Sequence, residues 1–141
     1  MVIDQYIMNG GKVLWFIDGV NVSIDSLANG ATFAFINDLN INDQLFNYGV
    51  RINANLVQDI QCNVLPVQAG MNGSQAKWVP APWLYYPVIS PLVQHPVTRD
   101  LNLIFSRFPS QIDTIGGSEK VKKTFLLRTS AFSKTVNAPL Y

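Results

Sequence analysis

The spacing of hydrophobic and polar positions predicts short helices that alternate with short strands. Apolar side chains at Val2, Ile3, Tyr6 and Ile7 recur at the spacing of one helical face, with polar residues on the other face. Gly10 follows, and a glycine just past a last helical turn accepts the left-handed conformation that ends a helix. The chain is therefore expected to begin with a short amphipathic helix.

An uninterrupted apolar run comes next, at Val13–Ile17. Because it has no polar alternation, it is typical of a central strand that is covered on both faces. A glycine follows Asp18, so this carboxylate is expected at the end of that strand. Helix, turn and buried strand together make half of an α/β unit.

A second helix is predicted between Asn40 and Gly49. Asn40 is a suitable N-cap, Asp43 stands at the third helical position, and an apolar stripe continues to Tyr48. Extended segments are expected directly afterwards, at Val50–Ile52 and Leu56–Val57.

A hairpin is predicted from two β-prone segments, Cys62–Val67 and Ala76–Val79. The intervening "AGMNGSQ" is rich in turn formers and favours a loop over a tight two-residue turn. Pro66 cannot donate a ladder hydrogen bond, so it is expected on an edge.

The later part of the chain offers weaker signals. Prolines are frequent from Pro80 to Pro96, and regular structure is not expected there. Alternation at Leu101–Phe108 and the apolar Phe125–Leu127 make these the last strand candidates. Residues 1–141 are therefore expected to form one α/β domain, with a mixed, largely parallel sheet flanked by short helices in the flavodoxin manner, plus the β-hairpin. The ends fall within element-like segments, which suggests a fragment of a longer protein.

Composition narrows the classes of partner. With 48% hydrophobic and 13% charged residues, the chain is suited to a packed core and not to disorder. A formal charge of +1 gives no field that would attract nucleic acid or anionic lipid. The basic cluster of Lys120, Lys122 and Lys123 is interpreted as a solvated strand entrance. The longest apolar run is too short to cross a bilayer, so no direct membrane insertion by this segment is expected.

Reactive side chains are few. The single cysteine, Cys62, and the single histidine, His95, would have to act together in any Cys-His hydrolase. Cys62 lacks the small neighbours of a nucleophile elbow, and the proline after His95 favours a role in ordering the next segment. Asp18 is either a turn residue or a strand-end site. No catalytic residue, cofactor or metal site is predicted.

The densest aromatic cluster consists of Trp78, Trp83, Tyr85 and Tyr86. Three interpretations fit it: a flap over the domain's own sheet, a surface that binds another protein, or a platform for sugars. The sequence leaves these alternatives open.

Long segments of the chain together resemble a known family. "DQYIMNGGKVLWFIDGVNVSIDSL", "NDLNINDQLFNYGVRINANLVQD", "HPVTRDLN" and "LLRTSAFSKTVNAP" occur in this order, and they resemble gliding-motility-associated ABC-transporter auxiliary proteins of Bacteroidetes, of the GldG type. That family is distantly similar to the glutamine-amidotransferase-like fold. The enzymes of that fold carry a cysteine in a glycine-flanked elbow, which this sequence lacks, so no catalytic residue is carried over.

The resemblance implies a non-enzymatic domain on the extracytoplasmic, periplasmic face of the inner membrane. Its implied partners are the membrane and ATPase subunits of an ABC transporter, with protein or substrate contacts as its mode of action in gliding motility or secretion. Self-association as a homodimer is a further expectation. The alternatives from other classes are a carbohydrate-binding module and a cryptic Cys-His hydrolase.

Overall fold

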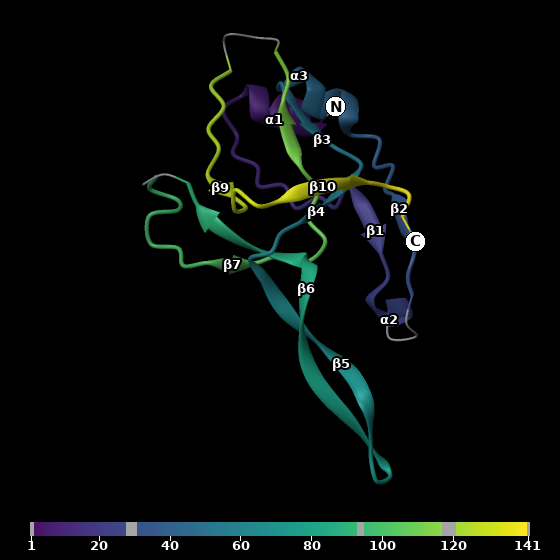
Figure 1. The fold of residues 1–141 in the computed structure, drawn as a ribbon. Coiled ribbons are helices and arrows are strands. Elements are labelled where there is room, and N and C mark those ends of the chain that lie inside the picture. Colours follow the sequence, from purple (N-terminus) through teal and green to yellow (C-terminus); the bar gives the residue numbers. More distant parts are fainter. Residues whose placement is uncertain (1, 28–30, 93–94, 117–120, 141) are drawn as a thin grey trace.

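A computed structural model describes residues 2–27, 31–92, 95–116 and 121–140, and its described part is built mainly from short strands with one long projecting hairpin (Figure 1). In chain order the elements are α1 (Val2–Met8), β1 (Val20–Val22), α2 (Ile24–Leu27), β2 (Ala34–Ile36), α3 (Asn42–Asn47), β3 (Val50–Ile52), β4 (Asn55–Gln58), β5 (Cys62–Asn72), β6 (Gln75–Pro91), β7 (Ile104–Phe105), β8 (Ile112–Thr114), β9 (Leu127–Arg128) and β10 (Lys134–Asn137).

All strand pairs among the described residues are antiparallel. β1 pairs with β2, β4 with β10, and β3 with β8, while β6 pairs with β5, β7 and β9. The expected mixed, largely parallel α/β sheet of the flavodoxin or amidotransferase kind is therefore wrong. Parallel strands need long crossovers, usually helical, and the described helices have only 7, 4 and 6 residues.

The first helix and its end are confirmed. Gly10 has φ +87°, and the N–H groups of Gly10 and Gly11 donate to the carbonyls of Ile7 and Tyr6. The apolar face of this helix is largely open to solvent, because Val2 is 85% exposed and no residue of α1 is buried.

Val13–Ile17 is not a strand, contrary to expectation. The segment runs outside the sheets, and Leu14 and Phe16 are 78% and 89% exposed. The apolar run predicted a strand that is buried on both faces. In the structure other residues pack against only one side of the segment.

The second helix is confirmed as α3, and Gly49 follows it with φ +74°. The predicted cap is wrong: Ile41 occupies the N-cap position, without a side-chain hydrogen bond. Asn40 instead adopts a left-handed conformation with φ 52°. The predicted extended segments after this helix are confirmed as β3 and β4.

The hairpin is confirmed, but its connection is tighter than expected. β5 continues to Asn72 and β6 begins at Gln75, which leaves only Gly73 and Ser74 between them. Gly73 has φ +64°, as the first central position of a type II′ turn requires. The strands therefore absorb most of the segment that was interpreted as a loop.

Prolines do not prevent β6 from forming, so the expectation of irregular structure after Pro80 is wrong as far as Pro91. Pro66 lies directly opposite Pro80, and neither has an N–H, so they form a non-hydrogen-bonded pair. Pro82, two residues further along, has the same orientation opposite Val64. All three nitrogens face the outer edges of the hairpin, where no ladder hydrogen bond is lost. This confirms the predicted edge position of Pro66.

The late strand candidates are only partly confirmed. Of Leu101–Phe108, Ile104–Phe105 forms β7, and the candidate at Phe125–Leu127 is shifted to Leu127–Arg128. In the basic cluster, Lys123 donates from Nζ to the carbonyl of Ile115 at 3.1 Å, whereas Lys120 lies outside the described residues.

The core lies where β1, β2 and β4 meet. Val20, Ala34 and Leu56 are 2–4% exposed and contact one another. Partly buried hydrophobic side chains surround them, including Tyr85 and Phe108. This small core joins the N-terminal strands to β6 and to the segment after β7.

A buried carboxylate ties the C-terminal segment to the end of β4. Asp59 is 1% exposed, and its oxygens accept hydrogen bonds from Ser130 N at 2.7 Å, Ser130 Oγ at 2.6 Å and Gln61 N at 2.9 Å. Burial works against the charged form. The hydrogen bonds from Ser130, Gln61 and Ile60 outweigh it and hold the pKa of Asp59 below its ordinary value.

We expect Asp59→Ala to lower the free energy of unfolding by roughly 2–4 kcal/mol, because the donors from Ser130 and Gln61 lose a charged acceptor. Chemical denaturation followed by circular dichroism measures this. Asp25→Ala, at an exposed carboxylate in α2, is the matched control and should change little. Equal effects of the two substitutions would contradict the role assigned to Asp59.

Acid should weaken the same link. Because the pKa of Asp59 is lower in the folded chain than in the unfolded chain, its contribution is complete above the unfolded value of about 3.9 and is lost as the pH falls through the folded value. Between about pH 6 and about pH 3, we expect wild-type stability to fall more steeply than that of Asp59→Asn, which lacks this carboxylate. Parallel slopes in denaturation curves would contradict the prediction.

Candidate functional site

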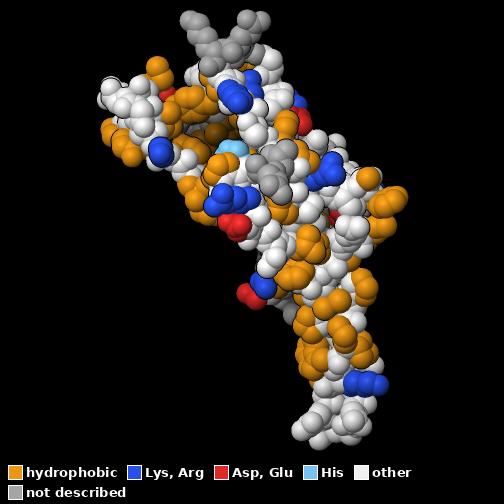
Figure 2. All heavy atoms as spheres, turned by 90° about the vertical axis from the view of Figure 1, so that its left-hand side faces the viewer, with side chains coloured by type: hydrophobic (Ala, Val, Ile, Leu, Met, Phe, Trp, Pro, Cys, Tyr) orange, Lys and Arg blue, Asp and Glu red, His pale blue; other side chains and the backbone are white. Residues whose placement is uncertain are grey.

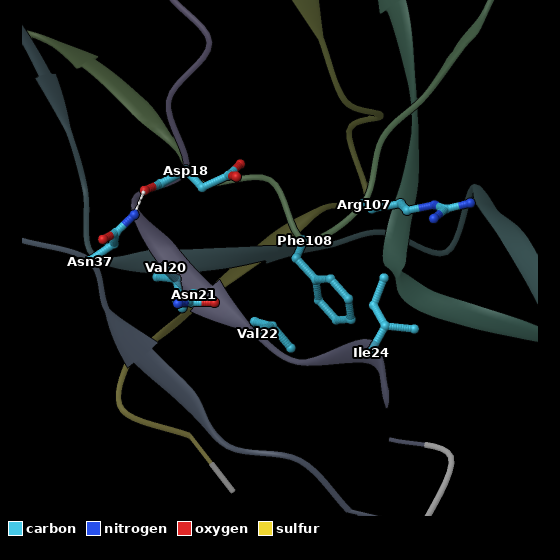
Figure 3. A pocket seen from close by; sticks show the side chains of 8 residues that line it. All are labelled: Asp18, Val20, Asn21, Val22, Ile24, Asn37, Arg107 and Phe108. Atoms are coloured by element: carbon cyan, nitrogen blue, oxygen red, sulfur yellow. Dashed lines mark hydrogen bonds between the residues drawn. The ribbon is translucent and has the colours of Figure 1, made fainter. Parts of the chain in front are cut away.

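A pocket of about 330 Å³ lies beside β1 (Figure 3). It combines two opposite charges with two amides and an apolar wall. Its lining residues are Asp18, Val20, Asn21, Val22, Ile24, Asn37, Arg107 and Phe108.

Asp18 is located just before β1 and not at the end of a preceding strand. Its backbone carbonyl accepts a hydrogen bond from Asn37 Nδ2 at 3.0 Å, and Asn37 N donates to the carbonyl of Gly19 at 3.1 Å. The Asp18 side chain remains exposed at one end of the pocket (Figure 3). The contacts thus fix the backbone at this point, while a binding role for the carboxylate stays a prediction.

The wall opposite is formed by Arg107 and Phe108. Phe108 has φ 50°, an uncommon left-handed conformation for a bulky residue, and its N–H donates to the carbonyl of Tyr85 at 2.9 Å. Its ring packs at 6.2 Å from the Tyr85 centroid and edge-on at 5.2 Å from the Tyr86 centroid. The guanidinium of Arg107 lies 5.7 Å from the centroid of Tyr86. Ring packing therefore compensates for the strained backbone.

The aromatic cluster does not form a common plane. Tyr86 is 5% exposed and belongs to the core, Trp83 and Tyr85 are half-buried and tilted by 48°, and Trp78 is 60% exposed on the hairpin. A sugar platform needs several coplanar rings that face solvent, and of these four rings only that of Trp78 is exposed. Trp83, Tyr85 and Tyr86 pack against the rest of the domain, as the flap interpretation expects. Trp78 is exposed and could contact another molecule.

The two reactive residues lie in different elements. Cys62 begins β5, and His95 lies in the turn that follows β6; neither lines the pocket that contains Asp18. His95 Nδ1 accepts a hydrogen bond from Val97 N at 3.3 Å, and its carbonyl accepts from Thr98 N and Arg99 N. This confirms that His95 orders the segment after it.

Neither a metal centre nor a membrane helix is found in the part of the chain that the structure describes. No group of three or more His, Cys, Asp or Glu side chains there could hold a metal ion. No helix among those residues is long and apolar enough to span a bilayer.

The sequence matches one protein family along its full length. The family is described as an ABC-type uncharacterized transport system, and the match covers residues 1–141. The chain belongs to this family. No curated protein and no solved structure matches it. As a family member, the chain is an auxiliary component associated with an ABC-type transport system.

Of the eight residues that line the pocket in this transport-system component, the sequence analysis predicted only Asp18 as a site residue. Asn37, Arg107 and Phe108 carry no motif, and Phe108 has a left-handed backbone at a residue type that rarely adopts it. Alternation in Leu101–Phe108 did suggest an ordered segment, but it gave no reason to place this segment beside Asp18.

We expect Phe108→Ala to destabilise the fold by about 2 kcal/mol, because it removes a half-buried ring that packs on Tyr85 and Tyr86. Phe105→Ala is the matched control, since the Phe105 ring in β7 is 64% exposed. Thermal or chemical denaturation measures both. If the two substitutions cost the same, the ring packing at Phe108 is not what holds the pocket wall.

Proposed function

We propose that the chain is a non-catalytic, extracytoplasmic domain of an ABC-transporter auxiliary component linked to gliding motility or secretion, and that it acts through protein contacts. The observation that carries the proposal is the hairpin of β5 and β6, which projects away from the rest of the described fold (Figure 1).

One face of this hairpin is mostly apolar, with Gln68 opposite Trp78 as its polar member. Val64 and Trp78 are 49% and 60% exposed, and the three prolines Pro66, Pro80 and Pro82 are exposed on the same face. Side chains of alternate residues share a face, and cross-strand partners share it too, which makes these five residues one continuous strip. Figure 2 shows hydrophobic side chains along the hairpin. Aromatic and apolar side chains of this kind are typical anchors of protein interfaces.

The prolines also determine how the hairpin can bind. Their nitrogens face the outer edges of β5 and β6, so these edges have fewer of the donors that an added strand would need. Contacts therefore fall on the side-chain face. Such a surface binds through packing of rigid side chains, which loses little entropy on association.

The absence of catalysis is proposed from the placement of the reactive groups. Cys62, His95 and Asp18 belong to three different parts of the fold, and His95 uses its Nδ1 to order a turn. A Cys-His mechanism needs the thiol and imidazole within hydrogen-bond reach. No hydrogen bond between Cys62 and His95 supports the hydrolase alternative among the described residues.

The extracytoplasmic location and the link to gliding motility are supported by the resemblance of four long segments to the gliding-motility auxiliary proteins. The family match supports the broader context of an ABC-type transport system. The membrane and ATPase subunits of the transporter are the partners that we propose.

We expect Trp78→Ser to reduce recovery of transporter membrane and ATPase subunits at least tenfold in co-purification, because it removes the largest exposed anchor of the strip. Lys77→Ser is the matched control, since Lys77 neighbours Trp78 but projects from the other face of β6. Quantitative mass spectrometry of the purified complex measures the recovery.

Both variants should retain the wild-type circular dichroism spectrum, because each side chain is exposed. If Trp78→Ser and Lys77→Ser recover the transporter equally well, the hairpin face is not the contact. If the wild-type chain recovers no transporter subunit, the proposed function itself fails.

A further inference from the structure

Residues Lys12 to Ile17 form a stretch of backbone without hydrogen bonds to the described residues. Burial alternates along it, since Trp15 and Ile17 are half-buried whereas Leu14 and Phe16 are 78% and 89% exposed. A period of two is the signature of an extended chain. The segment therefore has the form of a strand without a neighbouring strand.

The inner side of this segment is partly covered. Val13, Trp15 and Ile17 line a groove of about 450 Å³ together with apolar residues of β3, such as Val50 and Ile52. The outer side carries Leu14 and Phe16, which contact nothing that would shield them from water. Exposed extended segments of this kind pair readily with another chain.

Opposite charges flank the apolar residues. Lys12 and Asp18 are both exposed, and among the described residues neither takes part in an ion pair. Lys12, Leu14, Phe16 and Asp18 are separated by steps of two, so they share the outer face of the extended segment. This face presents, in order, a positive charge, two apolar groups and a negative charge.

We propose that the segment Lys12–Asp18 pairs antiparallel with the same segment of a second copy of the chain. With Trp15 opposite Trp15 on a two-fold axis, Lys12 lies opposite Asp18 at each end, and Leu14 lies opposite Phe16. Each charge thus meets its opposite, each exposed apolar group meets another, and the unpaired backbone groups gain partners. The interface is isologous, as a two-fold dimer requires.

A second copy fits better than an unrelated strand because the charge order is self-complementary only in this antiparallel register. A shift of one residue would also place outer-face side chains opposite inner-face side chains, so the alternation fixes the register. The interface is small, and we therefore expect a weak, reversible dimer that is destabilised by salt through screening of its two terminal pairs.

Charge reversal tests this register directly. Asp18→Lys places two lysines opposite each other at both ends of the interface, and Lys12→Asp places two aspartates there. We expect each variant to raise the dimer dissociation constant at least tenfold in analytical ultracentrifugation. Asp25→Lys makes the same charge change as Asp18→Lys at an exposed position in α2, and it should dimerise like the wild type.

The two variants should bind each other. In a mixture, the two lysines of the Asp18→Lys chain face the two aspartates of the Lys12→Asp chain, so each end regains one pair of opposite charges. The heterodimer should therefore form with nearly wild-type affinity, and its recovery also demonstrates that both variants are folded.

Two results would overturn the proposal: a wild-type chain that stays monomeric at all concentrations, or an Asp18→Lys chain that dimerises normally. A mixture of the two variants that fails to associate, while both retain the wild-type circular dichroism spectrum, would overturn the register. These outcomes are independent of transporter recovery through Trp78, so either proposal can fail alone.

Discussion

The carboxylate of Asp59 joins parts of the chain that are far apart in sequence, and much of the architecture depends on it. It lies at the end of β4 and accepts two hydrogen bonds from Ser130, just before β10. β4 and β10 then pair along four residues, from Asn55 to Gln58. The backbone N–H of Asp59 donates to the carbonyl of Leu84, which adds β6 to the same junction. The cluster of three contacting buried side chains at Val20, Ala34 and Leu56 is small for so many short strands, so a satisfied buried charge supplies much of the specificity.

The hairpin illustrates how backbone chemistry can restrict a surface. A two-stranded ribbon exposes two edges, and open edges invite uncontrolled strand addition. Here Pro66, Pro80 and Pro82 occupy outward-facing positions and remove donors from those edges without disturbing the internal ladder. The same residues stiffen the apolar strip around Trp78. One set of side chains thus hinders edge pairing and prepares a face for packing, and because the proline nitrogens lie outside the internal ladder, a proline-rich segment can still be the longest strand described.

Local signals in the sequence identified the pieces whose structure is determined locally. Gly10 and Gly49 end their helices as expected, and the hairpin forms because its turn and register are set by nearby residues. The sheet class was wrong because parallel pairing was inferred from the apolar run at Val13–Ile17, and an apolar run alone does not say which strand lies beside it. The pocket residues Arg107 and Phe108 could not be predicted, since their approach to Asp18 depends on long-range packing against Tyr85 and Tyr86. Of the residues that line the pocket, only Asp18 was predicted, and on the hairpin only the exposed Trp78 was.

The incorrect strand prediction and the exposed apolar segment have one physical cause. A run such as Val13–Ile17 gains stability only when both of its faces are covered and its backbone is paired. The described fold covers one face, through the groove formed with Val50 and Ile52, and leaves Leu14 and Phe16 in water. The sequence thus encodes more burial than this chain alone provides. Because unpaired backbone groups are satisfied most completely by another extended backbone, strand pairing accounts for both the apolar composition and the flanking charges, whereas a flat apolar contact would account only for the composition.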